Sequence, residues 1–467
     1  MRKAKIVCTL GPASINRKII SELIRNGMDV ARLNFSHSDH ETHQRVSQIV
    51  REESERQKKI VSILQDLQGI KIRIGNVIGG QVMLETGKEV FLYPGIKDSN
   101  DESIYISYPA LLKDVYEGHT VLIDDGLIKL KVIGRTNKAL KAKVIEGGIL
   151  RTKKGVNLPD SKTTLHAFTD KDKKDLEFGL KIGVDYVAIS FVRRAQDIDI
   201  IKRWAKKRGL KLPPLIAKIE KPEALDNIEE IMDISDGIMV ARGDLGVEMA
   251  TEKVPLIQKM LIDLANKKGK IVITATQMLE SMTQHTRPTR AEATDVANAV
   301  LDGTDALMLS AETAMGRYPI ESLKMMDTII RYTEKNLYNK IQSSYQLGNT
   351  FPEAIADIAC RASINLGANA IVVFTHSGFT ARLISKMRPN VPVIAFTPDA
   401  IALRSIPIFW GTIPNLITKV NILEEEFISE AEKILIEDGL LKKGDIIVLA
   451  ASSPFLGKPN VIRLHKL

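Results

Sequence analysis

The stretch that decides the fold is residues 238–248, Ile238-Met-Val-Ala-Arg-Gly-Asp244-Leu-Gly-Val-Glu248. Its apolar run ends abruptly in Arg-Gly-Asp, which is typical of a buried parallel strand that delivers a carboxylate to a functional rim. Upstream, the run at residues 215–220 also ends in a lysine and a carboxylate, Lys218 and Glu220. Asp244 and Glu220 on neighbouring strand ends would share one hard cation, and a lysine beside them suits a substrate rich in negative oxygens. One such run is an ordinary strand with a charged end, but two adjacent runs favour a functional site.

The composition is that of a soluble globular protein with two or three domains: 467 residues, 44% of them hydrophobic and 26% charged. No apolar run is long enough to span a membrane, and the first residues lead into a strand rather than a signal peptide. Two cysteines exclude a disulfide framework and indicate a reducing cytoplasm. The net charge is +9, but aromatic residues make up only 5% of the chain. We therefore expect anionic metabolites as partners, with no nucleic acid and no membrane.

Strand and helix patterns alternate on both sides of a different central region. Strand candidates occupy residues 3–10, 28–34 and 60–66, then 184–190, 215–220, 237–242, 270–276 and 305–310. Ser14 is the expected cap of a helix at residues 17–26. Eight βα units predict a TIM barrel with its functional residues at the carboxyl ends of the strands. Those ends carry cations, carboxylates and hydroxyls suited to phosphate and metal: Arg32, Asn34, Ser36, Asp66, Lys218, Glu220, Asp244, Thr276, Ser310 and Glu312.

The expected fold class is α/β, a TIM (β/α)8 barrel with an inserted all-β lid domain and a C-terminal α/β domain. Residues 69–166 contain no convincing long helix and read as short strands, from 71–77 onward, separated by Gly, Asn and Pro. Residues 1–68 and 167–337 would form the barrel, and residues 338–467 a regulatory domain with strands at 370–374, 391–396, 408–413 and 446–450.

Seven stretches resemble the pyruvate kinase family, and in order, spacing and architecture the resemblance covers essentially the whole chain. They are ARLNFSH at 31–37, DLQGIKIR at 66–73, KKGVNLP at 153–159, IAKIE at 216–220, VARGDLGVE at 240–248, TQMLESM at 276–282 and MLSAETA at 308–314. The resemblance implies phosphoryl transfer from phosphoenolpyruvate to ADP, giving pyruvate and ATP. It also implies a mobile lid and a cytoplasmic enzyme that is usually a homotetramer.

The resemblance assigns the catalytic and substrate-binding roles. Glu220 and Asp244 match the ligands of Mg²⁺ or Mn²⁺, and Lys218 matches the residue that stabilises the transferring phosphoryl group and the enolate. The substrate phosphate would contact Arg32, and its carboxylate would contact Thr276 with the backbone of Gly243 and Asp244. Thr276 and Ser310 are candidates for a water relay that protonates the enolate, whereas Glu312 is expected to support its neighbours.

The resemblance also assigns a nucleotide site, with Asn34, Arg73 and Lys154, and a K⁺ site in many members. The K⁺ site matches Asn34, Ser36, Asp66 and the carbonyl of Leu67. Lys71 stands where K⁺-requiring members usually have Glu. An ammonium there would supply the charge of K⁺ and repel a second cation. Our hypothesis is that Lys71 replaces K⁺.

The loop at residues 375–381 resembles the family's effector phosphate loop, through Thr375, Ser377, Gly378 and Thr380. A phosphorylated allosteric activator is one interpretation, and a plain helix cap by Ser377 or Thr380 is the other. The partner segment at 452–460 departs from the usual Gly/Thr-rich pattern.

Two other functions compete with this reading of the whole chain. A metal-dependent barrel aldolase or lyase acting on pyruvate enolate would share the metal pair but would not need Arg73, Lys154 or ADP. A catalytically silent protein that binds RNA through its basic surface would show a steep salt dependence of binding.

Overall fold

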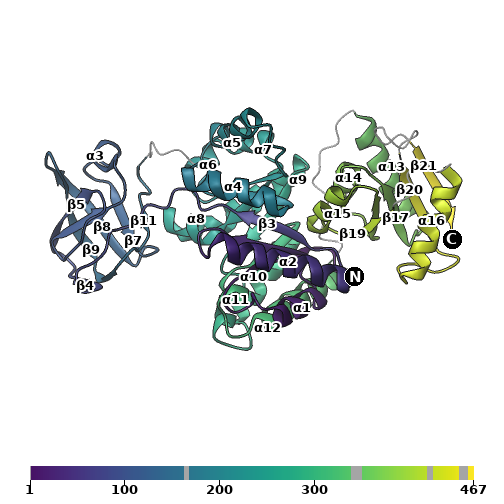
Figure 1. Cartoon of the computed structure of the whole chain (residues 1–467), viewed down its shortest axis with the longest axis horizontal. Coiled ribbons are helices and arrows are strands. Elements are labelled where there is room, and N and C mark those ends of the chain that lie inside the picture. The colour runs from purple at the N-terminus through teal and green to yellow at the C-terminus, as the bar shows by residue number, and fades with distance from the viewer. Residues whose placement is uncertain (1, 162–167, 338–349, 418–423, 452–460) are drawn as a thin grey trace.

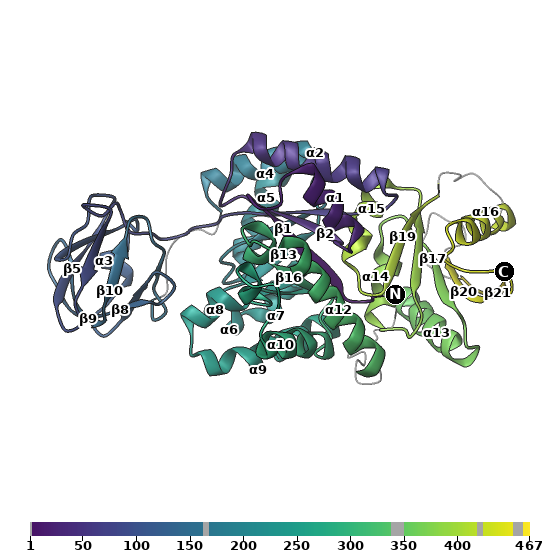
Figure 2. The same ribbon diagram turned by 90° about the horizontal axis from the view of Figure 1, so that it is seen from below.

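The computed structural model of the chain describes residues 2–161, 168–337, 350–417, 424–451 and 461–467. Figures 1 and 2 show three parts in a row along the longest axis, with an eight-stranded barrel in the middle. A β-rich insert lies at one end of the barrel, and an α/β unit lies at the other. The predicted fold class is therefore confirmed.

Eight parallel strands close the central barrel in the order β1-β16-β15-β14-β13-β12-β3-β2. Their residues are almost all buried, because helices cover the outside and side chains from alternate positions fill the inside. The strands are β1 (Lys5–Leu10), β2 (Val30–Asn34), β3 (Ser62–Asp66), β12 (Tyr186–Ile189), β13 (Leu215–Ile219), β14 (Gly237–Ala241), β15 (Ile271–Ala275) and β16 (Ala306–Leu309).

Helices connect successive strands around the barrel, and a short α8 (Arg242–Glu248) follows β14 directly. The other helices of this part are α1 (Arg17–Arg25), α2 (His40–Arg56), α4 (Asp170–Ile182), α5 (Ala195–Lys207), α6 (Glu223–Asp226), α7 (Ile228–Ile234), α9 (Val254–Lys267), α10 (Arg290–Leu301), α11 (Ala311–Ala314) and α12 (Pro319–Leu337). None of the described helices is long and apolar enough to cross a bilayer.

The insert, which we call the lid, leaves the barrel after β3 and returns before α4. Its main sheet has six strands in the order β11-β7-β8-β9-β5-β6, and β10 pairs with β4 in a second sheet. The elements are β4 (Gln81–Leu84), β5 (Glu89–Pro94), β6 (Ser103–Ile106), α3 (Leu111–Asp114), β7 (Thr120–Ile123), β8 (Ile128–Arg135), β9 (Leu140–Glu146), β10 (Gly148–Arg151) and β11 (Val156–Asn157). The lid has a core of its own, which includes Val90, Ile104 and Leu130.

The C-terminal unit is a five-stranded sheet in the order β19-β18-β17-β20-β21, with helices on both faces. Its elements are α13 (Phe351–Asn365), β17 (Ala370–Phe374), α14 (Phe379–Lys386), β18 (Val393–Thr397), α15 (Ala400–Ser405), β19 (Thr412–Leu416), α16 (Glu424–Glu437), β20 (Ile446–Ala451) and β21 (Val461–Lys466). Of the described strands in this sheet, only β21 runs antiparallel to its neighbour.

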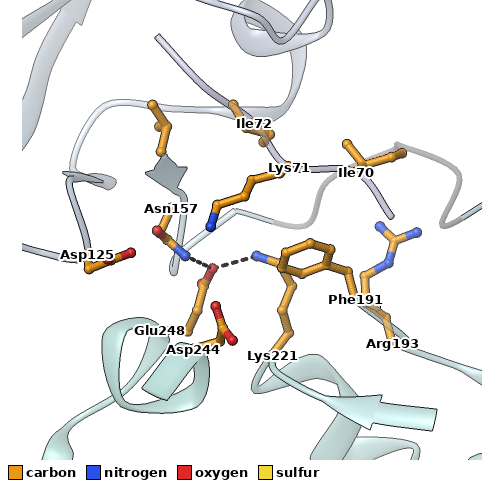
Figure 3. A pocket seen from close by; sticks show the side chains of 11 residues that line it. Ile70, Lys71, Ile72, Asp125, Asn157, Phe191, Arg193, Lys221, Asp244 and Glu248 are labelled. Carbon is orange, nitrogen blue, oxygen red and sulfur yellow. Dashed lines mark hydrogen bonds and ion pairs between the residues drawn. The ribbon is translucent and has the colours of Figure 1, made fainter. Parts of the chain in front are cut away.

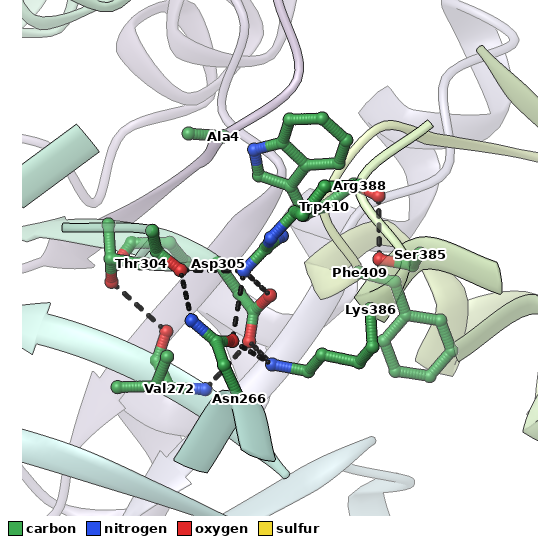
Figure 4. A network of polar contacts seen from close by, with 12 residues as sticks. Ala4, Asn266, Val272, Thr304, Asp305, Ser385, Lys386, Arg388, Phe409 and Trp410 are labelled. Carbon is green, nitrogen blue, oxygen red and sulfur yellow. Dashed lines mark hydrogen bonds and ion pairs between the residues drawn. The ribbon is translucent and has the colours of Figure 1, made fainter. Parts of the chain in front are cut away.

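A buried cluster of charges joins the C-terminal unit to the amino ends of the barrel strands (Figure 4). Asp305, which precedes β16, accepts hydrogen bonds from Lys386 Nζ at 2.5 Å and from the Val272 backbone N–H at 2.8 Å. Arg388 Nη2 lies 2.9 Å from the other carboxylate oxygen, and its guanidinium stacks over Trp410 at 4.8 Å. The C-terminal unit therefore covers the end of the barrel opposite the lid.

Local details differ from the sequence-based expectations in four places. Asn16, not Ser14, caps α1, because its side chain accepts a hydrogen bond from the Ile19 N–H. The strand expected at 408–413 begins later, at Thr412, after a 3-10 turn that contains Pro407. Residues 71–77 form isolated bridges rather than a strand, and β21 was not predicted.

Candidate active site

The carboxyl ends of the barrel strands form a rim, which we call the carboxyl rim. Lys218 lies at its centre, near the end of β13. Its Nζ is 2.7 Å from Glu220 Oε1 and 3.2 Å from Asp66 Oδ1. It also donates a hydrogen bond of 2.9 Å to Ser190 Oγ, which in turn donates one of 2.6 Å to the Leu67 carbonyl. Burial disfavours the charged lysine, but the two carboxylates outweigh it and raise the pKa of Lys218. The ammonium is thus kept charged and held in one position.

Arg32, in the middle of β2, and Asp66, at the end of β3, form the neighbouring pair. Arg32 Nε donates to Asp66 Oδ2 at 2.7 Å, and its Nη1 donates to Thr9 Oγ1 at 2.9 Å. Burial opposes the charge on Asp66, but Lys218 and Arg32 prevail and hold the pKa of this carboxyl below its ordinary value. Asp66 therefore organises two cations that face the rim.

Glu220 and Asp244, the predicted metal ligands, place carboxylate oxygens after two adjacent strands, β13 and β14. Glu220 Oε2 accepts a hydrogen bond of 2.6 Å from the Phe191 N–H, and Asp244 lies in the first turn of α8. Burial raises the pKa of Glu220 to about 7, against the attraction of Lys218 and with the repulsion of Asp244. Among the described residues no group of three or more His, Cys, Asp or Glu side chains could hold a metal. Two carboxylates fit Mg²⁺, which takes few protein ligands and completes its shell with substrate and water.

Thr276 and Gly243 meet beside Asp244. The Gly243 N–H donates to Thr276 Oγ1 at 2.7 Å, and Thr276 has a positive φ of 68° directly after β15. A β-branched residue rarely adopts that φ, and such strain clusters at functional sites. A Cβ on residue 243 would lie 3.2 Å from Thr276 Oγ1, so the close approach favours glycine.

Ser310 and Glu312 follow β16 on the same rim. Glu312 is fully buried and accepts hydrogen bonds from the backbone N–H groups of Ser310, at 2.7 Å, and Leu279, at 3.0 Å. Glu312 therefore supports its neighbours, as expected. Ser310 Oγ is buried and has no hydrogen-bond partner among the described atoms.

The lid residues assigned to the nucleotide form their contacts within the lid. Arg73 Nη1 donates to the Lys153 carbonyl at 3.0 Å, and Lys154 Nζ lies 2.8 Å from Asp124. Burial, and then the positive charge of Arg73, lower the pKa of His37 in the turn after β2, so Arg73 lies within electrostatic reach of the rim. Lys71 is exposed, and its stem passes Gly155, where a Cβ would lie 3.2 Å from Lys71 Cε.

A cavity of about 590 Å³, open to solvent, separates the lid from the rim (Figure 3). Its lining comes from the lid side, with Lys71, Asp125 and Asn157, and from the barrel side, with Asp244 and Glu248. The predicted metal ligand Asp244 thus faces the same space as the lid.

Asp66 and the carbonyl of Leu67, two of the predicted K⁺ ligands, already have ionic or hydrogen-bond partners in this structure. Asp66 binds Arg32 and Lys218, and the Leu67 carbonyl accepts the Ser190 hydroxyl. Asn34 Oδ1 accepts a hydrogen bond from the Ser36 N–H at 3.1 Å, so both side chains lie in one turn after β2.

Comparisons with known proteins agree with this geometry. The family model for the pyruvate kinase barrel domain matches residues 1–323, and that for the pyruvate kinase alpha/beta domain matches residues 353–465. The chain belongs to the pyruvate kinase family. It is a phosphotransferase with pyruvate kinase activity.

Relatives support the assignment over the full chain. The pyruvate kinase of Sporosarcina psychrophila is 42% identical over 100% of this chain and 80% of its own length. That of Geobacillus stearothermophilus is 43% identical over 99% of this chain and 80% of its own length. A crystal structure of a pyruvate kinase from Cryptosporidium parvum superposes with a TM-score of 0.93, at 37% identity, covering 100% of this chain and 96% of that one.

Sequence reasoning missed Ser190 and Glu248. Ser190 follows β12 and anchors Lys218, and its position at a strand end was a usable signal. Glu248 is the last residue of the stretch 238–248. Its hydrogen-bond donors, Asn157 in β11 and Lys221, lie far away in sequence. No local pattern could have joined them.

The proposed effector loop follows β17 as expected. Gly378, with a φ of 80°, is the N-cap of α14, and neither Ser377 nor Thr380 caps the helix with its side chain. Instead Thr375 Oγ1 accepts a hydrogen bond of 3.0 Å from the Gly378 N–H. The partner segment at 452–460 lies outside the described residues.

Proposed function

We propose that the carboxyl rim transfers the phosphoryl group of phosphoenolpyruvate to ADP, with Lys218 stabilising the charge that develops. The observation that carries this proposal is the fixed Lys218 ammonium, held by Glu220, Asp66 and Ser190. A charge that is already positioned needs no reorganisation as the phosphoryl oxygens and the enolate become more negative. Pyruvate should form only when phosphoenolpyruvate, ADP and a divalent cation are all present, whereas a lyase would not need ADP.

The remaining rim residues would position the substrate. Arg32 would contact the phosphate, and Thr276 with the Gly243 and Asp244 N–H groups would hold the carboxylate. When the enolate collapses to pyruvate, its carbon must take a proton. The buried Ser310 hydroxyl, which lacks a partner among the described atoms, supports a relay through water at this side. Asn34, Arg73 and Lys154 would hold ADP.

Glu220 and Asp244 would hold the divalent cation, Mg²⁺ or Mn²⁺. When bound, the cation neutralises charge on the phosphoryl, enol and carboxylate oxygens of the substrate. The deep burial of Glu220 beside Asp244 supports this role, because two carboxylates facing each other are stabilised by a shared cation.

Mg²⁺ affinity should fall as the pH falls through about 7, because the pKa of Glu220 is raised to about 7 and a proton competes with the metal for this carboxylate. Below that pH the affinity should drop up to about tenfold per unit. Titration of the substrate-free enzyme with Mn²⁺, followed by electron paramagnetic resonance at pH 6 and pH 8, measures the effect. Equal affinities at the two pH values would contradict it. The Glu220→Gln variant, which binds no such proton, should lose the pH dependence together with most of the affinity.

We further propose that Lys71 replaces K⁺. Initial rates should stay within about twofold when tetramethylammonium is substituted for K⁺, since the ammonium of Lys71 already supplies a cation on this side of the cleft. The Lys71→Glu variant should lose activity in tetramethylammonium and recover it in K⁺. A large loss in the unmodified enzyme on removal of K⁺ would sink the hypothesis.

The resemblance supports a homotetramer and a phosphorylated activator at Thr375, Ser377, Gly378 and Thr380. Sedimentation velocity tests the assembly. Rates at low phosphoenolpyruvate, with and without AMP or sugar monophosphates, test the activator, and an unchanged rate with all of them would remove that part of the proposal.

A further inference from the structure

Glu248, the last residue of the stretch 238–248, contacts both the lid and the barrel beside the cavity (Figure 3). Glu248 Oε1 accepts a hydrogen bond of 2.8 Å from Asn157 Nδ2 in the lid. The same oxygen accepts a second one, also of 2.8 Å, from Lys221 Nζ in the barrel. The Glu248 side chain is only 2% exposed, so these contacts are made away from bulk solvent.

The charge on Glu248 explains why the contact has three members. Glu248 is the last residue of α8, where the partial negative charge of the helix end disfavours a carboxylate. Lys221 compensates this charge, because its ammonium forms an ion pair with the carboxylate. The Lys221 side chain is only 14% exposed. A hydrogen bond from a neutral amide to a buried carboxylate is stronger than one between neutral groups. Asn157 therefore binds a carboxylate whose negative charge Lys221 compensates.

Each of the three residues is linked through its own segment to the proposed active site or to the lid. Glu248 ends the helix whose first turn carries Gly243 and Asp244, and Lys221 directly follows Glu220. Asn157 lies in β11, which pairs with β7 in the main sheet of the lid. Gly126 of the lid also lies near α8, since a Cβ added to it would come within 3.9 Å of Val247 Cγ1.

We propose that Asn157, Glu248 and Lys221 form a latch that holds the lid over the rim, with Asn157 and Glu248 as positioning residues for ADP. This inference rests on the proposed function, because it gives the lid its task of carrying Arg73 and Lys154 to the nucleotide. When the latch is closed, the strand that follows Lys154 is fixed to the helix that carries Asp244. When it opens, the lid and its two cations move away from the rim as one body.

The latch predicts different effects on the two substrates. The substitution Asn157→Leu keeps the size of the side chain and removes the donor. It should raise KM for ADP about tenfold or more, the size expected for loss of a hydrogen bond to a charged group. KM for phosphoenolpyruvate, whose proposed contacts lie on the barrel, should change by less than about twofold. Glu248→Gln leaves an acceptor for Asn157 but a neutral one, so its effect on KM for ADP should be smaller.

Lid position gives a readout that does not depend on catalysis. The two cysteines, Cys8 and Cys360, are buried, so spin labels can be attached at exposed positions through Glu117→Cys in the lid and Lys207→Cys on α5. Distance distributions of the enzyme without substrates should show the spacing of this structure in the parent protein. That population should shrink in Asn157→Leu and shrink less in Glu248→Gln.

A double variant tests whether the two residues act on each other. Asn157→Leu with Glu248→Gln should resemble Asn157→Leu alone, because the bond can be lost only once. Asn137→Leu, the same change at an exposed lid position, is the matched control and should leave the distances and KM for ADP unchanged. If the change in KM for ADP in the double variant equalled the combined changes of Asn157→Leu and Glu248→Gln, the proposal would be overturned.

Two further results would also overturn it. One is an unchanged distance distribution in Asn157→Leu, and the other is an altered distribution with an unchanged KM for ADP. Failure of the proposed function looks different: the parent protein would form no pyruvate, while the distances would still respond to Asn157→Leu.

Discussion

Replacing Lys218 by methionine should lower kcat by a factor on the order of 10²–10³ or more, the loss expected when a preorganised charge is removed from a transition state. Methionine fills a similar volume but offers no cation. The developing charge on the phosphoryl group and the enolate would then lack the ammonium that Asp66 and Glu220 hold in place. Binding of phosphoenolpyruvate should weaken much less than kcat, because Arg32, Gly243 and Thr276 remain.

Steady-state rates and calorimetric binding of phosphoenolpyruvate separate these two effects. Lys206→Met, the same substitution at an exposed position on α5, is the control and should keep the parental kcat. The melting temperature of each variant shows whether the rim stays folded. A kcat within tenfold of the parent would mean that another group carries the charge, and the assignment of Lys218 would fail.

Asp305→Asn should cost about 3–5 kcal/mol of stability, the size reported when one partner of a buried ion pair is removed. The side chains of Asp305, Lys386 and Arg388 are each only 2% exposed, so the variant removes a buried counter-ion that both cations contact. Burial already lowers the pKa of Lys386 to about 8, although Asp305 opposes the shift. Without Asp305 that pKa should fall further.

The pH dependence of this loss has a definite sign. Lys386 would shed its proton in the folded variant at a pH where the unfolded chain keeps it, so the variant gains stability relative to the parent as the pH rises. The stability lost in Asp305→Asn, relative to the parent protein, should be largest near pH 6 and smaller by pH 9. Urea denaturation at both pH values, followed by tryptophan fluorescence, measures it, since Trp410 lies against Arg388.

Asp263→Asn provides the matched control for Asp305→Asn. Its partner Lys267 lies one helical turn away on α9, and both side chains are exposed. A pair of this kind contributes about 0.3–0.5 kcal/mol. If Asp305→Asn cost no more than this control, the buried charges would not hold the C-terminal unit to the barrel.

The barrel could be predicted from the sequence because its signals are local. Most strands are short apolar runs with a polar residue near or just after their end, such as Lys218 in β13 and Asp244 after β14, and parallel strands gather such ends on one rim. The caps were less predictable. Ser14 and Asn16 both suit the start of α1, and only the backbone at the turn after Gly11 decides between them.

The contacts between parts of the molecule could not be predicted. Asn157 and Glu248 are 91 residues apart, and Lys386 is 81 residues from Asp305. Each is an unremarkable polar residue in its own segment, and its partner is set by how the lid or the C-terminal unit packs on the barrel. The resemblance to the family supplied roles for the rim residues, but it supplied none for these pairs.

The transfer itself is tested most directly by following the phosphorus. Phosphorus NMR of the enzyme with phosphoenolpyruvate, ADP and Mg²⁺ should show the phosphoenolpyruvate signal replaced by that of the γ-phosphate of ATP, with one pyruvate formed per ATP. Release of inorganic phosphate without ATP, or pyruvate formed in the absence of ADP, would contradict the account.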